Sequence, residues 1–81
     1  MARVLLFGRL SDIAGWRERS FDPAPATLFA LKTLLAEEDA GLGAALDGKG
    51  VQAALDRVLV RGDHPLTAGC EVAFMPPMSG G

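Results

Sequence analysis

Short apolar runs lie near both ends of the chain. The run at residues 4–7 ends at Gly8, and the run at residues 70–75 ends at Pro76 and Pro77. Apolar runs of about four to eight residues that are bounded by glycine or proline are typical of buried strands. The pattern therefore predicts a first strand at 4–7 and a last strand at 70–75, which the prolines stop because they lack an N–H group.

The middle of the chain shows helical spacing instead. Four leucines fall on one side of a helix drawn from Thr27 to Glu38: Leu28, Leu31, Leu34 and Leu35. This spacing is that of a helix with a single apolar stripe, and Thr27 suits the N-cap because its hydroxyl can accept a backbone hydrogen bond. Weaker patterns predict strands at 17–21 and 57–61, a helical turn at 10–14, a loop at 22–25, and a loop at 41–50 with a short helical turn at 42–46.

These elements favour an α+β fold. Strands at both ends with one principal helix between them are arranged most economically as a mixed sheet of four or five strands packed on one main helix, as in a β-grasp fold. We predict a β-grasp domain over residues 1–76. Residues 77–81 are predicted to form a flexible tail that ends in Gly80 and Gly81.

The side chains of strands alternate between the two faces of a sheet. The single helix covers one face, so the other face should be wet. By alternation this wet face carries the charged side chains of Arg3, Arg57, Arg61 and Glu71. It also carries Phe7, Leu59 and Met75, which would form an apolar patch with a charged rim if the strands are neighbours. Such a patch indicates a protein interface, although scattered exposed apolar residues are also normal.

Composition narrows the classes of function. The chain has 81 residues, a net charge of −2, one cysteine and one histidine, which exclude an internal disulfide and a cysteine-rich zinc site. This fits a reducing compartment, and we expect the protein to be cytoplasmic. No basic block points to nucleic acid, and no apolar run approaches the ~20 residues of a membrane span. We expect neither nucleic acid nor a membrane as a partner.

Two stretches resemble catalytic or binding motifs only in part. Residues 43–50 nearly fit the phosphate-binding pattern G-x-x-x-x-G-K-[ST], but Gly50 has no hydroxyl and no apolar strand precedes the stretch. We interpret it as a flexible glycine-containing loop. His64 and Cys70 could form a nucleophile pair, yet no third group orients the histidine and alternation places the cysteine in the core. The chain therefore has no self-sufficient active site, and we expect no bound cofactor or metal.

The residues after the prolines, Met78, Ser79, Gly80 and Gly81, suit a carboxyl group that a partner must reach. A carboxylate is a poor electrophile at neutral pH, but joining it to AMP makes an acyl donor, from which sulfide can displace the nucleotide to give a thiocarboxylate. Two glycines leave that carbonyl open to attack, and the double proline stiffens the exit. Four residues reach roughly 12–14 Å when extended. Gly-Gly alone would favour the interpretation as a disordered end.

Three stretches resemble the small subunit of molybdopterin synthase, the MoaD-type sulfur carriers. The ending at 72–81 is similar to that family's strand, double proline and Ser/Thr-Gly-Gly. Residues 63–72 resemble its D-x-P-L-x-D-G-D-E-V turn and strand, and residues 4–15 resemble its opening strand and short helix. The chain departs from the pattern at four positions: Cys70 and Ala68 replace acids, Asp56 replaces asparagine, and Met75 replaces an aromatic residue.

The resemblance implies a ubiquitin-like β-grasp fold and a function. It implies that an E1-like enzyme adenylates Gly81 with Mg-ATP, and that a separate sulfur-delivering enzyme allows its conversion to a thiocarboxylate. The tail would then enter the large subunit and donate sulfur to precursor Z (cyclic pyranopterin monophosphate), forming the molybdopterin dithiolene. This chain would be non-catalytic alone and would work in a heterotetramer of two small and two large subunits. The resemblance places the contact with the large subunit at Phe7, Leu59 and Met75, next to the tail.

Four alternatives stay open. A sulfur carrier for thiazole synthesis shares the fold and the Gly-Gly ending, though such chains tend to be shorter and lack the double proline. A carrier for tRNA thiolation or protein conjugation is barely separable by sequence. An interaction domain with an inert tail would be indifferent to loss of Gly80 and Gly81. A nucleotide-binding module would use residues 43–50 and would bind nucleotide as an isolated chain.

Overall fold

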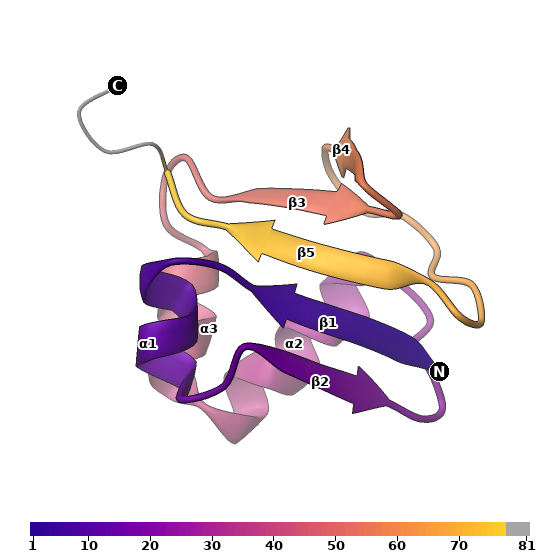
Figure 1. Cartoon of the computed structure of the whole chain (residues 1–81), viewed down its shortest axis with the longest axis horizontal. Helices are drawn as coiled ribbons and strands as arrows, with labels where there is room; N and C mark the ends of the chain where they lie inside the picture. Colours follow the sequence, from indigo (N-terminus) through magenta and orange to yellow (C-terminus); the bar gives the residue numbers. More distant parts are fainter. Residues whose placement is uncertain (78–81) are drawn as a thin grey trace.

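The computed structural model describes residues 1–77, and within them it has five strands and three helices. In chain order these are β1 (Ala2–Leu6), α1 (Arg9–Ala14), β2 (Glu18–Phe21), α2 (Leu28–Glu38), α3 (Ala40–Leu46), β3 (Gln52–Leu55), β4 (Val58–Val60) and β5 (Glu71–Met75). The strands form one sheet in the order β2-β1-β5-β3-β4 (Figure 1). β1 pairs with β5 in parallel and the other pairs are antiparallel, so the predicted mixed sheet and α+β class are confirmed.

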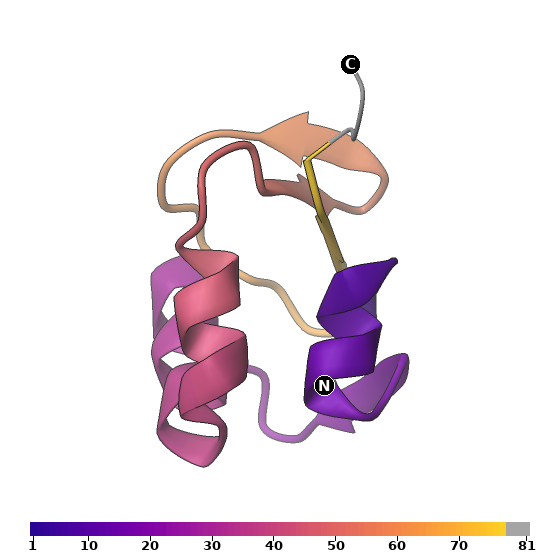
Figure 2. The ribbon, with the colours of Figure 1, turned by 90° about the vertical axis from the view of Figure 1, so that its left-hand side faces the viewer.

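The helices lie on one side of the sheet. In Figure 1, α2 and α3 are behind the strands, and the face toward the viewer carries no helix of the described residues. Figure 2 shows α2 and α3 side by side, with α1 across from them at the end of the sheet, where it packs against α3. We call the uncovered side the outer face. No helix within residues 1–77 is long and apolar enough to cross a membrane.

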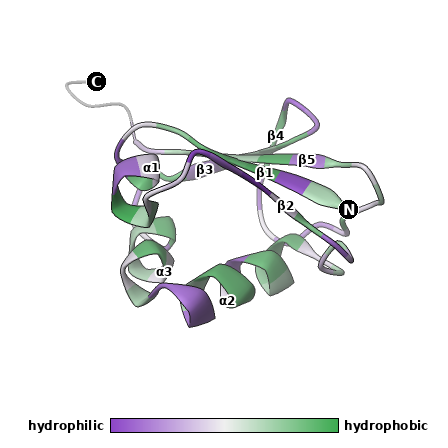
Figure 3. Ribbon diagram, turned by 60° about the horizontal axis from the view of Figure 1, so that its bottom comes forward, coloured by the Kyte–Doolittle hydropathy of each residue, from purple (hydrophilic) through white to green (hydrophobic). Residues whose placement is uncertain are grey.

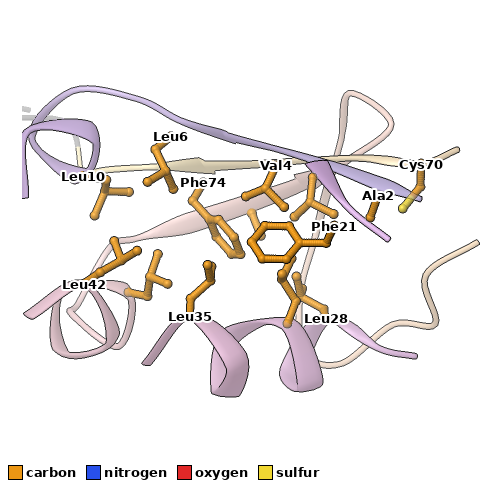
Figure 4. Close-up of a cluster of buried hydrophobic side chains, with 14 residues drawn as sticks. Ala2, Val4, Leu6, Leu10, Phe21, Leu28, Leu35, Leu42, Cys70 and Phe74 are labelled. Atoms are coloured by element: carbon orange, nitrogen blue, oxygen red, sulfur yellow. The ribbon is translucent and has the colours of Figure 1, made fainter. Parts of the chain in front are cut away.

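The core lies between the sheet and α2, and it confirms the predicted alternation. Val4, Val72 and Phe74 are fully buried, and Leu31 and Leu35 of α2 pack in the same cluster. Figure 4 shows the rings of Phe74 and Phe21 pointing from the strands toward the helix. Burial of one such large apolar side chain contributes about 1.5–3 kcal/mol. The central strands β1 and β5 therefore supply most of the sheet surface against which the helices pack.

The start of α2 is fixed by side chains from two parts of the chain. The Thr27 hydroxyl accepts a hydrogen bond from the Ala30 N–H group at 3.1 Å, as predicted for an N-cap. The Asp63 carboxylate accepts one from the Phe29 N–H group at 2.8 Å, and the Leu28 N–H group donates to the His64 carbonyl at 2.9 Å. The loop before β5 is thereby tied to the main helix.

The helical turn predicted at 42–46 is confirmed but is longer than expected, and only the rest of the loop predicted at 41–50 is a loop. Ala40–Leu46 form the regular helix α3, whose N-cap Asp39 accepts a hydrogen bond from the Leu42 N–H group at 3.1 Å. The phosphate-loop candidate is thus partly helical, and the element before it is a helix rather than a strand. Gly43 lies against Ala36 of α2, so close that an added Cβ would stand 2.5 Å from the Ala36 Cβ. Close helix packing explains this glycine better than a bound phosphate does.

Strand β3 was not predicted. Its sequence, Gln-Ala-Ala-Leu, has little of the β-branched and aromatic character that favours strands. It forms a strand because β5 and β4 supply partners on both sides: Ala53 lies opposite Phe74 and also opposite Val60. Tertiary pairing here overrides local preference.

Candidate interaction face and tail exit

A row of apolar side chains crosses the outer face from β1 to β4. Leu5 pairs with Ala73, Ala73 pairs with Ala54, and Ala54 pairs with Leu59. Because paired residues of neighbouring strands point to the same face, these four side chains form one line across four strands. Ala54 was missed because β3 was not predicted.

Ala54 and Ala73 form the middle of this row. Each is only 8% exposed, although neither belongs to the core cluster under the sheet. Both are small, and as a pair they lie between the larger side chains of Leu5 and Leu59, which accounts for their burial. In Figure 3 the ribbons of β1 and β5 are coloured hydrophobic over most of their length, as expected for strands that are apolar on both faces.

Phe7 and Met75 extend the row toward the end of β5. The Phe7 N–H group donates to the Phe74 carbonyl at 3.1 Å, which places Phe7 beside Met75. Phe7 is 48% exposed, Leu59 is 59% exposed and Met75 is partly buried. The structure thus brings Phe7 and Met75 together. Leu59 lies on β4, on the far side of β3, and Ala54 and Ala73 lie between it and the β1 side of the row. We call the whole set the apolar patch: Leu5, Phe7, Ala54, Leu59, Ala73 and Met75.

The opposite end of the outer face is charged. Arg3 donates to the Glu71 carboxylate at 2.7 Å and lies 3.4 Å from the Glu18 carboxylate. These are largely exposed pairs, whose contribution to stability is small. The predicted charges therefore lie at the start of β1 and β5, and the apolar residues lie toward their ends. Arg57 and Arg61 are exposed, but both lie outside β4.

The apolar patch ends where the chain leaves the sheet. β5 occupies the middle of the sheet, between β1 and β3 (Figure 1). Pro76 follows it and is partly buried, and Pro77 is exposed. The predicted site residues Met78, Ser79, Gly80 and Gly81 lie outside the described residues. A partner seated on the patch would thus lie next to the exit of the carboxyl-terminal segment.

The turn between β3 and β4 retains its hydrogen bonds despite the departures noted in the sequence. Asp56 and Arg57 both have positive φ, 49° and 71°, a geometry that aspartate tolerates better than most residues. The Asp56 carboxylate accepts from the Glu71 N–H group at 2.9 Å, and the Asp56 N–H group donates to the Glu71 carbonyl at 2.8 Å. Asp56 therefore ties this turn to the start of β5.

The Cys70 and His64 pair has no catalytic geometry. Cys70 is 2% exposed, and burial, followed by the charge of Asp56, raises the pKa of its thiol above the ordinary value of 9.0. A thiol of this kind is a poor nucleophile at neutral pH. His64 Nε2 lies 3.0 Å from the Arg61 carbonyl oxygen, which can only accept, so this nitrogen carries the proton. Within residues 1–77 no cluster of three metal-ligating side chains occurs.

Comparison with known proteins gives concordant matches. The model of the ThiS family matches residues 4–81. The molybdopterin synthase sulfur carrier subunit of Escherichia coli strain K12 is 36% identical over 81 residues, which are 100% of both chains.

Among solved structures, SAMP1 from Haloferax volcanii shares the fold with a TM-score of 0.84 and 24% identity, over 99% of this chain and 98% of its own. A chain in the complex of subunits 1 and 2 of molybdopterin-converting factor from Helicobacter pylori 26695 has a TM-score of 0.70 and 26% identity. That match covers 99% of this chain and 97% of the other. The chain belongs to the ThiS family, and along its whole length it is similar to a molybdopterin synthase sulfur carrier subunit.

Proposed function

We propose that this protein is the sulfur carrier subunit of a molybdopterin synthase and that Gly81 carries the sulfur. The observation that supports this most is the similarity to the Escherichia coli carrier, which extends over the full length of both chains and so includes Gly80 and Gly81. The geometry agrees with a carrier, because an apolar patch lies on the outer face and ends beside Pro76 and Pro77. The chain itself supplies the acyl group and a docking surface, and its partners supply the catalysis.

The chemistry takes place at the terminal carboxylate in two steps. A carboxylate oxygen of Gly81 attacks the α-phosphorus of ATP, bound with Mg²⁺ in an E1-like enzyme, and pyrophosphate leaves. Sulfide supplied by a separate delivering enzyme then attacks the acyl carbon, the bond from that carbon to the AMP oxygen breaks and AMP leaves, so that the terminus becomes a thiocarboxylate. Glycine at both final positions leaves the carbonyl free of a neighbouring Cβ. No cofactor has to be held by this chain.

The sulfur then goes to precursor Z in a large subunit, and two such transfers form the dithiolene of molybdopterin. We place the contact with the large subunit at Phe7, Leu59 and Met75, continuing along Pro76, Pro77, Met78 and Ser79 into its active site. The solved two-subunit complex of molybdopterin-converting factor contains a relative of this chain, which supports a large-subunit partner. A heterotetramer of two small and two large subunits, working in the cytoplasm, completes the proposal.

Protein conjugation is the second candidate. The structural likeness to two solved Haloferax volcanii structures, one named SAMP1 and the other small archaeal modifier protein 1, favours it at the level of fold. In that case the activated Gly81 would acylate a lysine amine instead of accepting sulfur. A carrier for thiazole synthesis or tRNA thiolation would share the thiocarboxylate and differ only in the acceptor.

The test of the acceptor is a reconstituted synthase reaction. Thiocarboxylated chain is mixed with the cognate large subunit and precursor Z, and the molybdopterin formed is measured. We expect about one equivalent of product for every two equivalents of carrier, because the dithiolene needs two sulfur atoms. Absence of product, while the Escherichia coli pair works in parallel, would contradict the synthase role and would direct attention to another acceptor.

A further inference from the structure

The position of β5 in the sheet brings two loops to the exit of the chain. β1 runs parallel to β5, so the loop after β1 lies at the carboxyl end of β5. β3 runs antiparallel to β5, so the loop before β3 lies at that same end. Gly8 is in the first of these loops and Gly50 is in the second. Figure 1 shows β5 ending between β1 and β3.

The strand register continues into these loops. Leu6 lies opposite Phe74, so two residues further Gly8 comes opposite Pro76. On the other side Gln52 lies opposite Met75. Two residues before Gln52, the antiparallel register brings Gly50 opposite Pro77. Each proline that follows β5 thus has a glycine as its neighbour, one on each side.

The contacts at both positions exclude a side chain. A Cβ added to Gly8 would lie 2.9 Å from the Pro76 Cγ, and a Cβ added to Gly50 would lie 2.7 Å from the Pro77 Cβ. Carbon atoms in contact normally stand about 3.5–4.0 Å apart. Both glycines also have positive φ, 56° and 81°. The proline rings therefore rest directly on the glycine backbones.

Among the positive-φ glycines of residues 1–77, the contact with a proline occurs at Gly8 and Gly50, next to the end of β5. Three other glycines with positive φ, namely Gly15, Gly62 and Gly69, have no atom within 4 Å of an added Cβ among residues 1–77. Their backbone geometry accounts for glycine by itself. At Gly8 and Gly50 the prolines add a second and independent reason.

We propose that Gly8 and Gly50 are positioning residues, which form a clasp around Pro76 and Pro77 and set the direction in which residues 78–81 leave the sheet. The proposal rests on the proposed function, because direction matters only if Gly81 has to reach a partner's active site. The apolar patch then supplies affinity for the partner, and the clasp aligns the reacting carboxylate with it.

Geometry gives the size of the effect. Four residues span at most about 13–14 Å, so a turn of roughly 10° at Pro77 moves the far end of the segment by roughly 2 Å. A misplacement of about 1 Å at a reacting group can cost about 100-fold in rate. Rotation within the segment recovers part of this loss. We therefore expect a loss of about tenfold for a displaced clasp.

The test measures activation of the full-length chain. The activating enzyme is assayed by exchange of pyrophosphate into ATP, with the carrier as the varied substrate. Gly50→Ala is compared with Gly69→Ala, since both glycines have a φ of 81° and only Gly50 contacts a proline. We expect Gly50→Ala to lower kcat about tenfold with KM within about threefold, and Gly69→Ala to leave both near the wild-type values.

Rescue experiments identify the responsible atoms. The clash of Gly8→Ala involves the Pro76 Cγ, which alanine lacks. In the Pro76→Ala background, Gly8→Ala should therefore no longer lower kcat. The clash of Gly50→Ala involves the Pro77 Cβ, which alanine keeps. In the Pro77→Gly background, Gly50→Ala should therefore no longer lower kcat, whereas in the Pro77→Ala background it still should. In each cycle the double variant is compared with its proline variant alone.

An unchanged kcat for Gly50→Ala, an equal loss for Gly69→Ala, or independent effects in both rescue cycles would overturn the clasp. The unfolding midpoints of the same variants separate the clasp from the proposed function. An extra loss of stability in Gly50→Ala that Pro77→Gly removes supports the contact even if the activating enzyme rejects the wild-type chain. Rejection of the wild-type chain, by an enzyme that activates another carrier, counts against the proposed function, and additive midpoints count against the clasp.

Discussion

Ala73 of β5 lies opposite Ala54 of β3 on the outer face, and each of the two side chains is 8% exposed. They lie between Leu5 and Leu59 and form an apolar surface with them, on a face that the helices α1, α2 and α3 do not cover. An apolar surface with charged residues at one end is typical of a surface that a partner covers. The location of the patch, next to Pro76 and Pro77, ties the docking of a partner to the placement of the tail.

Leu59→Glu should weaken binding to the large subunit about tenfold or more, because the new carboxylate is desolvated in an apolar contact. The side chain is 59% exposed in the free chain, so stability should change little. Val58→Glu is the matched control, since Val58 is 65% exposed, neighbours Leu59 and points to the other face. Titration calorimetry gives both affinities. Equal affinities for the two variants would remove Leu59 from the interface.

Removal of Gly81, or Gly81→Glu, should abolish sulfur transfer and leave the unfolding midpoint unchanged. The buried core cluster lies within residues 2–74, so neither change touches it. Removal of Gly81 moves the terminal carboxyl group back by one residue, and Gly81→Glu places a charged side chain next to it. The measurements are thiocarboxylate formation and thermal unfolding on the same samples. Full activity in either variant would show that the terminus is not the sulfur site.

Gly43→Ala should destabilise the fold although alanine is the better helix former. The intrinsic gain is about 1 kcal/mol, but the new methyl group would stand 2.5 Å from the Ala36 Cβ and 2.8 Å from the Ala36 backbone. Overpacking of a rigid helix interface costs about 1–3 kcal/mol. Because both opposing atoms are fixed to the backbone of α2, we expect the upper part of this range and a net loss of about 2 kcal/mol.

Urea unfolding measures this difference. Ala36→Gly in the Gly43→Ala background removes the shorter of the two close approaches and should restore part of the loss, since the approach to the backbone of residue 36 persists. A Gly43→Ala variant as stable as the parent chain would mean that α2 and α3 lie further apart than described.

Cys70 should make stability depend on pH in the alkaline range. Burial raises the pKa of its thiol above 9.0, so above this pH the unfolded chain loses the proton before the folded chain does. The unfolded state then binds fewer protons, and the free energy of unfolding falls as pH rises. The contribution is fully present below pH 9 and is lost as pH rises through the folded pKa.

The measurement is urea unfolding between pH 7 and pH 10.5, on the parent chain and on Cys70→Ala. The difference between the two chains isolates the contribution of the Cys70 thiol from the contributions of all other groups, which both chains share. A parallel fall in both chains would mean that Cys70 is not buried in the folded state.

The sequence predicted the parts of the fold whose local signals agree with their surroundings. The stripe of Leu28, Leu31 and Leu35 and the hydroxyl of Thr27 are sufficient to locate α2, because burial and capping act within one helix. The alternation around Phe7 and Met75 likewise assigned the faces of β1 and β5 correctly.

The errors occur where distant partners decide the structure. Residues 52–55 form a strand because two neighbouring strands pair with them. The helical turn expected at 42–46 extends to a helix over 40–46, which packs on α2 where Gly43 meets Ala36. The roles of Gly8 and Gly50 depend on register across β5, which a single sequence does not contain. A glycine in a loop was the only local signal for them, and Gly62 and Gly69 share it although an added Cβ there would meet no atom of residues 1–77 within 4 Å.

The central claim is that Gly81 becomes a thiocarboxylate, and intact mass spectrometry tests it most directly. The full-length chain is incubated with Mg-ATP, a cognate activating enzyme and a sulfur donor, beside a chain that lacks Gly81. The account predicts a mass increase equal to the replacement of one oxygen by sulfur, located at Gly81 and absent from the shortened chain. An unchanged mass, with an activating enzyme that modifies another carrier in the same mixture, would contradict it.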